Sequence, residues 1–264
     1  MEIREPERLT PVVGEADVIV VGSGPGGLSA AIAAARAGVS VILIERFGCF
    51  GGNITSVGVE GFAWYRHENT IEAGGLAFEY EQRAIESNAA VPESQSKSYE
   101  LDSEGFKVVA DNLVLKAGVR PMLHRAFCAP ILDGDEIKGV ITESKAGREA
   151  IIGKIIIDAT GDADVARRSG VKVFKNKKED MISASVMFHM SGVNKEEFMN
   201  EIERDPQKYS DWSDKNWQVQ TSGKEDDMFS PFLRKPFEKA KDSGLIDSDS
   251  VSYTHLTLPT SQYV

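Results

Sequence analysis

The segment Gly22–Gly27, with the sequence Gly-Ser-Gly-Pro-Gly-Gly, constrains the fold of this chain more than any other feature. Its G-x-G-x-x-G spacing follows an apolar, β-branched run, Asp17–Val21, and precedes an alanine-rich stretch, Leu28–Ala37, with its apolar residues on one helical face. A second apolar run, Val41–Ile44, ends on Glu45. The order strand, glycine turn, helix, strand predicts a βαβ unit of about 30 residues.

Each glycine of the motif has a physical role in binding a dinucleotide. Gly22 allows a tight turn, Gly24 lets the backbone approach a pyrophosphate, and Gly27 lets helix and strand pack closely. The pyrophosphate then meets free N–H groups at the positive end of the helix. Glu45, 23 positions after Gly22, can accept hydrogen bonds from a ribose diol. The motif predicts a dinucleotide site, completed by Pro25 and Gly26, but does not choose between NAD and FAD.

The segment that follows the first βαβ unit contains further elements. We expect an amphipathic helix within residues 72–87, a surface loop at 88–98 and a helix at 104–117. Four short strands are then expected at 121–124, 126–132, 137–143 and 150–157, with the turn signals Asp133-Gly134 and Ala146-Gly147 between them. The pattern predicts a small antiparallel meander, followed by an apolar strand that breaks at Gly161. Weaker patterns suggest a strand at 181–190 and a helix at 194–202.

Three blocks of the sequence together resemble the FAD-dependent oxidoreductase family that includes the flavoproteins related to the flavin-binding component of heterodisulfide reductase, and more remotely fumarate reductase flavoproteins. The blocks are Asp17–Arg46, Gly51–Thr55 and Ile157–Val165. The resemblance implies that the first block binds the ADP half of FAD and that Arg46 reaches the adenosine side. It further implies that Gly51, Gly52 and Thr55 run beside the ribityl chain and flavin ring, and that the strand end with Gly161 and Asp162 returns under the pyrophosphate.

The expected fold class is α/β: a Rossmann-type FAD-binding domain with a small antiparallel β-meander and an inserted, incomplete α+β substrate domain. We assign residues 14–52 and 100–180 to the FAD-binding domain, and residues 53–99 and 181–250 to the substrate or cap region.

The expected function is an FAD-dependent oxidoreductase that transfers a hydride or two electrons through the flavin, with the substrate and the catalytic residues unassigned. NAD(P)H is a candidate reductant, and the partner is a small-molecule substrate or a redox protein. The alternative is an electron-transfer flavin subunit that works with an iron–sulfur partner. The 4Fe-4S cluster enters only through the resemblance, because two cysteines cannot ligate one. A plain nicotinamide-dependent dehydrogenase is disfavoured by the meander.

Several single residues have both a functional and a structural interpretation. Cys49 lies two residues before Gly51, so a redox role near the flavin competes with simple packing, and Cys128 is expected in the core. His67 and His189 are weak candidates for contacting substrate. The carboxylates of Asp162 and Asp164 are typical of residues that cap a helix starting near Val165.

The charge and the cysteine content limit the partners and the cellular location that we expect for the protein. There are 41 acidic and 30 basic residues, a formal net charge of -11, which argues against nucleic acid or an anionic membrane surface as the main partner. Two cysteines do not make a disulfide framework, and no apolar run reaches the roughly 18 residues of a membrane span. We expect a cytoplasmic protein without a membrane span.

The C-terminal segment Val251–Thr260 reads like a translated sequencing adapter. We therefore expect residues 251–264 to be a non-native tail and the natural sequence to continue past about Ser250. On this interpretation the chain by itself binds ADP or FAD weakly and shows no substrate oxidation.

Overall fold

The computed structural model describes residues 3–4, 6–62, 66–67, 70–71, 74–92, 99–177, 181, 191–194, 196–197, 200, 204 and 239–245. The chain divides into two compact units. The first unit contains Met1–Gly61, Gly74–Ala90 and Leu101–Glu179, and the second contains Phe62–Ala73, Val91–Glu100 and Asp180–Val264. The candidate site lies entirely in the first unit.

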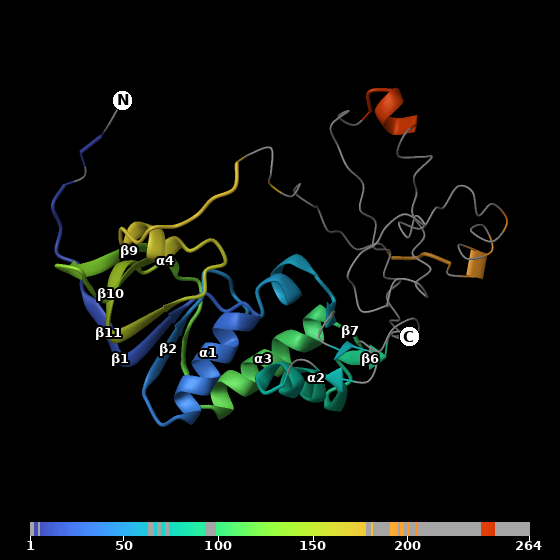
Figure 1. The fold of residues 1–264 in the computed structure, drawn as a ribbon, viewed down its shortest axis with the longest axis horizontal. Helices are drawn as coiled ribbons and strands as arrows, with labels where there is room; N and C mark the ends of the chain where they lie inside the picture. The colour runs from blue at the N-terminus through green and yellow to red at the C-terminus, as the bar shows by residue number, and fades with distance from the viewer. Residues whose placement is uncertain are drawn as a thin grey trace. The chain divides into compact units, whose positions relative to one another are not determined.

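A six-stranded sheet with the order β8-β2-β1-β11-β10-β9 forms the centre of the first unit (Figure 1). Strands β1 (Val12–Val21), β2 (Val41–Ile44), β8 (Arg120–Met122) and β11 (Gly147–Asp158) are mutually parallel, and the register pairs Ile19 with both Ile42 and Ile156. The four residues of β2 are all buried. Strands covered on both faces need apolar residues throughout, which explains the unbroken Val/Ile runs of the sequence.

Opposite faces of the parallel strands pack against different layers. Ile19, Val21, Ile42 and Ile44 share a core cluster with Val140 of the meander and with residues from β8, β11 and the short helix α4 (Asp164–Arg168). Because side chains alternate along a strand, Val18, Val20 and Leu43 point to the other face. There α1 (Pro25–Arg36) lies against β1 and β2 (Figure 1). Its Leu28 and Ile32 are completely buried. Helix α3 (Ser103–Lys116) packs beside α1.

The meander has the predicted turns, but the strands that pair with one another differ from the prediction. Strands β9 (Ala126–Asp133) and β10 (Glu136–Ser144) are antiparallel, and β10 pairs with the first half of β11. Residues 150–158 of β11 pair with β1, so residues 150–152 have a neighbour on both sides, and one 12-residue strand both ends the meander and completes the parallel sheet. The predicted strand at 121–124 corresponds to β8, which joins β2 and lies outside the meander. Turn residues mark where strands end, but not which strands become neighbours.

Helix α2 (Leu76–Glu86) falls within the predicted 72–87 helix and packs against α1 and α3. Tyr80 is buried, with its ring edge-on to Phe106 at 6.1 Å between centroids and its hydroxyl 3.0 Å from Ser29 Oγ. Burial raises the pKa of Tyr80 to about 12. Residues 74–90, which the sequence places with the substrate region, therefore form part of the compact unit that contains the glycine motif.

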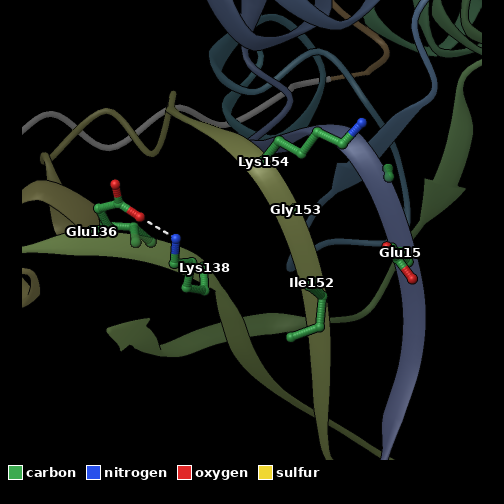
Figure 2. A pocket seen from close by; sticks show the side chains of 8 residues that line it. Glu15, Glu136, Lys138, Ile152, Gly153 and Lys154 are labelled. Atoms are coloured by element: carbon green, nitrogen blue, oxygen red, sulfur yellow. Dashed lines mark hydrogen bonds and ion pairs between the residues drawn. The ribbon is translucent and has the colours of Figure 1, made fainter. Parts of the chain in front are cut away.

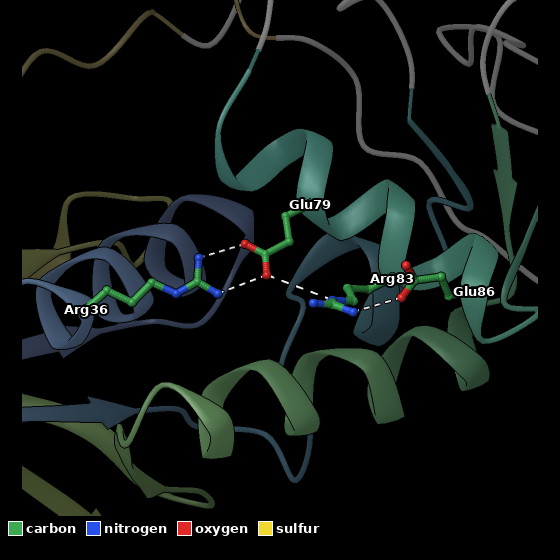
Figure 3. Close-up of polar contacts among 4 residues, drawn as sticks. All are labelled: Arg36, Glu79, Arg83 and Glu86. Carbon is green, nitrogen blue, oxygen red and sulfur yellow. Dashed lines mark hydrogen bonds and ion pairs between the residues drawn. The ribbon is translucent and has the colours of Figure 1, made fainter.

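A surface ion-pair network also joins α2 to α1 (Figure 3). Both terminal nitrogens of the Arg36 guanidinium, Nη1 and Nη2, donate to the carboxylate of Glu79, at 2.7 and 2.9 Å. Arg83 lies 3.9 Å from Glu79 and 2.8 Å from Glu86. These side chains are partly exposed, so we expect each pair to stabilise the packing by no more than about 1 kcal/mol.

The remaining described elements are short. Strands β3 (Gly61–Phe62), β7 (Tyr99–Leu101) and β6 (Ala90–Pro92) form a three-stranded sheet, so residues 90–92 of the predicted loop at 88–98 are a strand instead. Strands β4 (Arg66–His67) and β5 (Thr70–Ile71) form an antiparallel pair in the second unit. The predicted strand at 181–190 lies outside the described residues except for Met181, as do most of the predicted helix at 194–202 and all of the tail at 251–264.

Candidate dinucleotide-binding site

The direction of strand order reverses at the carboxyl end of β1. The chain passes from β1 to β2 and β8 on one side, then returns through the meander to β11 on the other side. In open α/β sheets, ligands bind outside the carboxyl ends of the strands at such a switch point. The segment Gly22–Gly27 follows β1 directly and therefore lies at this position (Figure 1).

Two glycines of the motif are required by close backbone contacts. Gly22 has φ +96°, and a Cβ atom on it would lie 2.3 Å from the carbonyl oxygen of Ala159. A Cβ atom on Gly27 would lie 1.9 Å from the carbonyl oxygen of Gly22. These contacts agree with the predicted roles of Gly22 in the turn and of Gly27 in helix–strand packing.

Gly24 and Gly26 differ from these two glycines. Apart from their chain neighbours and the backbone of α1 itself, no heavy atom of the described residues lies within 4 Å of a Cβ placed on either of them. Gly24 has φ -59°, a value open to any residue, so the backbone does not require glycine there. The space beside Gly24 is therefore available to a ligand.

The first turn of α1 provides hydrogen-bond donors at the same place. The helix starts at Pro25, three residues before the predicted start, because proline fits the first helical position. Its first i→i−4 bond joins Leu28 N–H to Gly24 O at 2.9 Å, so the N–H groups of Gly26 and Gly27 have no intrahelical acceptor. Gly24, the N-cap residue, makes no side-chain cap, and the first turn contains no acidic residue. This helix end can bind an anion.

Glu45 closes the site at the carboxyl end of β2 and is only 5% exposed. Its Oε2 accepts hydrogen bonds from the N–H of Ser23 at 2.9 Å and the hydroxyl of Ser23 at 2.6 Å. Its Oε1 accepts the N–H of Phe47 at 2.9 Å. The predicted ribose acid thus also ties the glycine loop to the end of β2. The sequence prediction missed Ser23, and the only signal for it was a hydroxyl residue at a variable position of the motif.

The second glycine pair packs directly on the first glycine motif. Gly51 has φ +113° and donates its N–H to the carbonyl oxygen of Ser23 at 2.9 Å. A Cβ atom on Gly52 would lie 2.7 Å from Gly24 Cα. Thr55, buried in the short π-helix Asn53–Val57, donates its hydroxyl to Phe50 O at 2.5 Å. The structure therefore brings together two blocks that are separated by more than 20 residues in the sequence.

The end of β11 contributes the third block. Ala159 N–H donates to Val21 O at 2.9 Å, which places the turn with Gly161 (φ +87°) beside the end of β1. The expected capping of α4 by Asp162 and Asp164 is wrong. Asp158 Oδ2 accepts the N–H of Ala166 at 2.9 Å instead, since the strand end points its carboxylate at the helix. Thr160 Oγ1 accepts the N–H of Asp164 at 2.9 Å, while Asp162 is exposed.

The other candidate residues lie at varied positions. Arg46 is exposed, with its guanidinium 4.7 Å from the ring centroid of Phe47. Cys49 Sγ lies 3.8 Å from the hydroxyls of both Thr55 and Ser56. Cys128 is only partly buried, on β9, rather than in the core as expected. The side chain of His67 and the whole of His189 lie outside what the structure describes.

A separate hollow of about 500 Å³ lies on the sheet away from these strand ends (Figure 2). Its lysines are already paired, Lys138 with Glu136 and Lys154 with Asp17. Residues of β1, β10 and β11 line it: Glu15, Ala16, Glu136, Ile137, Lys138, Ile152, Gly153 and Lys154. The hollow lacks the carboxyl-end position and the helix N-terminus that mark the dinucleotide site.

The sequence matches the family model described as FAD dependent oxidoreductase over residues 17–261. The chain belongs to this FAD-dependent oxidoreductase family. The match agrees with the resemblance in the three blocks, and favours a flavoprotein over a plain nicotinamide-dependent dehydrogenase.

Curated relatives of this family member have varied activities. A thiamine thiazole synthase of Saccharolobus islandicus is 30% identical over 171 residues, which are 60% of this chain and 60% of that protein. Digeranylgeranylglycerophospholipid reductase 2 of Methanopyrus kandleri is 30% identical over 192 residues, 69% of this chain and 46% of that protein. The chain thus spans less than two thirds of the length of these relatives.

The chain also resembles solved protein structures, at low sequence identity. The crystal structure of Thermovibrio ammonificans THI4 gives a TM-score of 0.45 at 21% identity, covering 60% of this chain and 64% of that one. A geranylgeranyl bacteriochlorophyll reductase-like protein from Thermoplasma acidophilum gives 0.43 at 19% identity, covering 60% and 43%.

Two further observations concern membranes and metals. In the part of the chain that the structure describes, no helix has the length and apolar character needed to cross a membrane. The same described residues include no group of three or more His, Cys, Asp or Glu side chains arranged to hold a metal ion.

Proposed function

We propose that this chain binds FAD through its ADP half, at the N-terminus of α1, in an enzyme that transfers a hydride or two electrons. The observation that carries the proposal is the meeting of three separate blocks at one strand-order switch point. Gly51 is hydrogen-bonded to the glycine loop, and Ala159 is hydrogen-bonded to the end of β1. Glu45 is held at the end of the neighbouring strand. These contacts support a single site.

The residues fit the ADP half of the cofactor. The open side of Gly24 and the N–H groups of Gly26 and Gly27 suit a pyrophosphate. Glu45 suits the ribose, because a carboxylate accepts hydrogen bonds and a ribose diol donates them. We assign the other roles from the family resemblance: Arg46 to the adenosine side, Gly51, Gly52 and Thr55 to the ribityl chain and ring, and Gly161 and Asp162 to the pyrophosphate.

The flavin supplies the redox chemistry when bound, while the protein binds and orients it. We leave the substrate unassigned, because the relatives differ in activity. NAD(P)H is a candidate reductant, and a small molecule or a redox protein is the partner. An electron-transfer role would use an iron–sulfur cluster outside these residues, on a partner protein or in a further part of the chain, since Cys49 and Cys128 provide only two thiols. The low cysteine content favours a cytoplasmic location.

Titration of the purified protein with FAD, ADP and FMN tests the proposal. Quenching of flavin fluorescence reports FAD and FMN binding, and calorimetry reports ADP binding. We expect FAD and ADP to bind and FMN, which lacks the adenosine, to bind more weakly. Failure of both FAD and ADP to bind a folded protein would overturn the assignment. Anaerobic addition of NADH or NADPH to the FAD complex then tests the reductant by the loss of flavin absorbance.

A further inference from the structure

Ser23 makes an unusually complete contact with Glu45. The serine is fully buried, and both its N–H and its hydroxyl donate to the same carboxylate oxygen, Oε2, at 2.9 and 2.6 Å. The hydroxyl of Ser23 has one proton, so its donor capacity is used in this bond. Glu45 Oε1 accepts the Phe47 N–H at 2.9 Å. The carboxylate is therefore fixed by three donors from two chain segments.

The three donors are divided unequally between the two carboxylate oxygens of Glu45, so one oxygen can accept a further hydrogen bond. A carboxylate oxygen accepts about two hydrogen bonds. Oε2 already accepts two from Ser23, whereas Oε1 accepts the single N–H of Phe47 among the described residues. Oε1 is thus the oxygen with room for a further donor. A carboxylate can only accept hydrogen bonds, so this group suits a hydroxyl donor rather than a phosphate.

We infer that Ser23 is a positioning residue for nucleotide recognition. Its hydroxyl holds Glu45 in one orientation, so that Oε1 receives a ribose hydroxyl of the ADP half. The inference rests on the proposed function, and adds to it a residue that acts on the ribose through Glu45. Without the hydroxyl, Oε2 loses its shorter bond and the carboxylate gains freedom to rotate within the pocket.

A second serine–carboxylate pair on the same two strands provides a control. Ser40, before β2, donates both its N–H and its hydroxyl to one oxygen of Asp17 in β1, at 3.0 and 2.6 Å. This pair has the same donors and acceptor type as Ser23 and Glu45, but it lies beside the amino end of β2, away from the carboxyl ends of the strands. Ser40→Ala removes the corresponding hydroxyl bond to the carboxylate, together with the 2.8 Å bond from Asp17 N–H to Ser40 Oγ, without touching the nucleotide site.

The experiment compares ADP with 2′,3′-dideoxy-ADP, which keeps the adenine and the pyrophosphate but lacks both ribose hydroxyls. Calorimetry on the full chain measures the affinity of wild type, Ser23→Ala and Ser40→Ala for each of the two ligands. We expect Ser23→Ala to lower the affinity for ADP by about three- to tenfold, the usual effect of losing one hydrogen bond. Its affinity for dideoxy-ADP should equal that of wild type. Ser40→Ala should leave both affinities unchanged.

Three outcomes would overturn the inference. Equal ADP affinity of wild type and Ser23→Ala shows that the hydroxyl has no role in recognition, while the proposed function stands. If Ser23→Ala lowers the affinities for ADP and dideoxy-ADP equally, the role of Ser23 is merely structural, because the loss of affinity then does not depend on the ribose hydroxyls. Failure of wild type to bind ADP removes both the inference and the proposed function. Circular dichroism of each variant before titration establishes that the protein compared is folded.

Discussion

The carbonyl oxygen of Ser23 accepts the backbone N–H of Gly51 at 2.9 Å, and this bond joins the two glycine-rich segments of the site. Gly52 packs on Gly24 at the same place, closely enough that a Cβ atom would lie 2.7 Å from Gly24 Cα. The glycine loop is therefore held from one side by Gly51 and Gly52, and the other side of Gly24 is free of described neighbours. The following predictions separate glycines needed for folding from glycines needed for binding.

Gly24→Ala should weaken the binding of FAD while leaving the fold stable. The new methyl group meets no described atom and φ is -59°, so the free energy of unfolding should stay within about 1 kcal/mol of wild type. The methyl would fill space assigned to the pyrophosphate, at a cost of about 1–3 kcal/mol in binding. Gly26→Ala is the control, with an equally open Cβ position, and should bind FAD at least as well as Gly24→Ala does. Equal FAD affinity of Gly24→Ala and wild type would contradict the placement of the pyrophosphate.

Gly27→Ala should destabilise the protein itself. Its Cβ would lie 1.9 Å from Gly22 O, and a backbone carbonyl cannot move away as a flexible side chain can. We expect the free energy of unfolding to fall by about 1–3 kcal/mol or more. Urea denaturation followed by circular dichroism measures the change, with Gly26→Ala as the reference. A Gly27→Ala protein as stable as that reference would show that α1 does not pack on β1 as described.

Asp158→Ala should destabilise the turn that contains Gly161. Asp158 accepts hydrogen bonds from Thr160 and Ala166, so its loss removes the cap of α4, at about 0.5–2 kcal/mol. Asp162→Ala, four residues away on the exposed turn, should leave the free energy of unfolding unchanged. Urea melts of both variants provide the measurement. The reverse ranking would restore Asp162 as the capping residue.

Asp17→Asn should reduce stability at neutral pH but not in acid. The side chain of Lys154, with Ser40, donates to Asp17 and holds the pKa of its carboxyl well below the ordinary value of 3.8. A pKa that is lower in the folded state stabilises the fold above the unfolded pKa, and this contribution is lost as the pH falls through the folded pKa. The stability difference between wild type and Asp17→Asn should therefore shrink below pH 3.8. Urea melts from pH 7 downward test this, and a difference independent of pH would refute it.

Local patterns in the sequence were sufficient for much of the fold. The β-branched runs predicted β2 at its observed limits and the core of β1, and periodicity located α2 and α3 within a few residues. The turn signals Asp133-Gly134 and Ala146-Gly147 separate β9, β10 and β11 as expected. The glycine motif and Glu45 lie at the predicted strand ends. These features depend on propensity, pleat and backbone freedom, which act over a few neighbouring residues.

Tertiary structure alone decided which distant residues meet. It placed β8 beside β2, gave β11 neighbours on both sides, and brought α2 onto α1. It also made Asp158 the cap of α4 and Ser23 the partner of Glu45, although neither residue stands out in the sequence. Such pairings depend on strand register and on the direction of a side chain at a strand end. Both are fixed only when the apolar faces of the sheet are buried against helices on one side and the meander on the other, because that packing selects a single arrangement among those that local preferences permit.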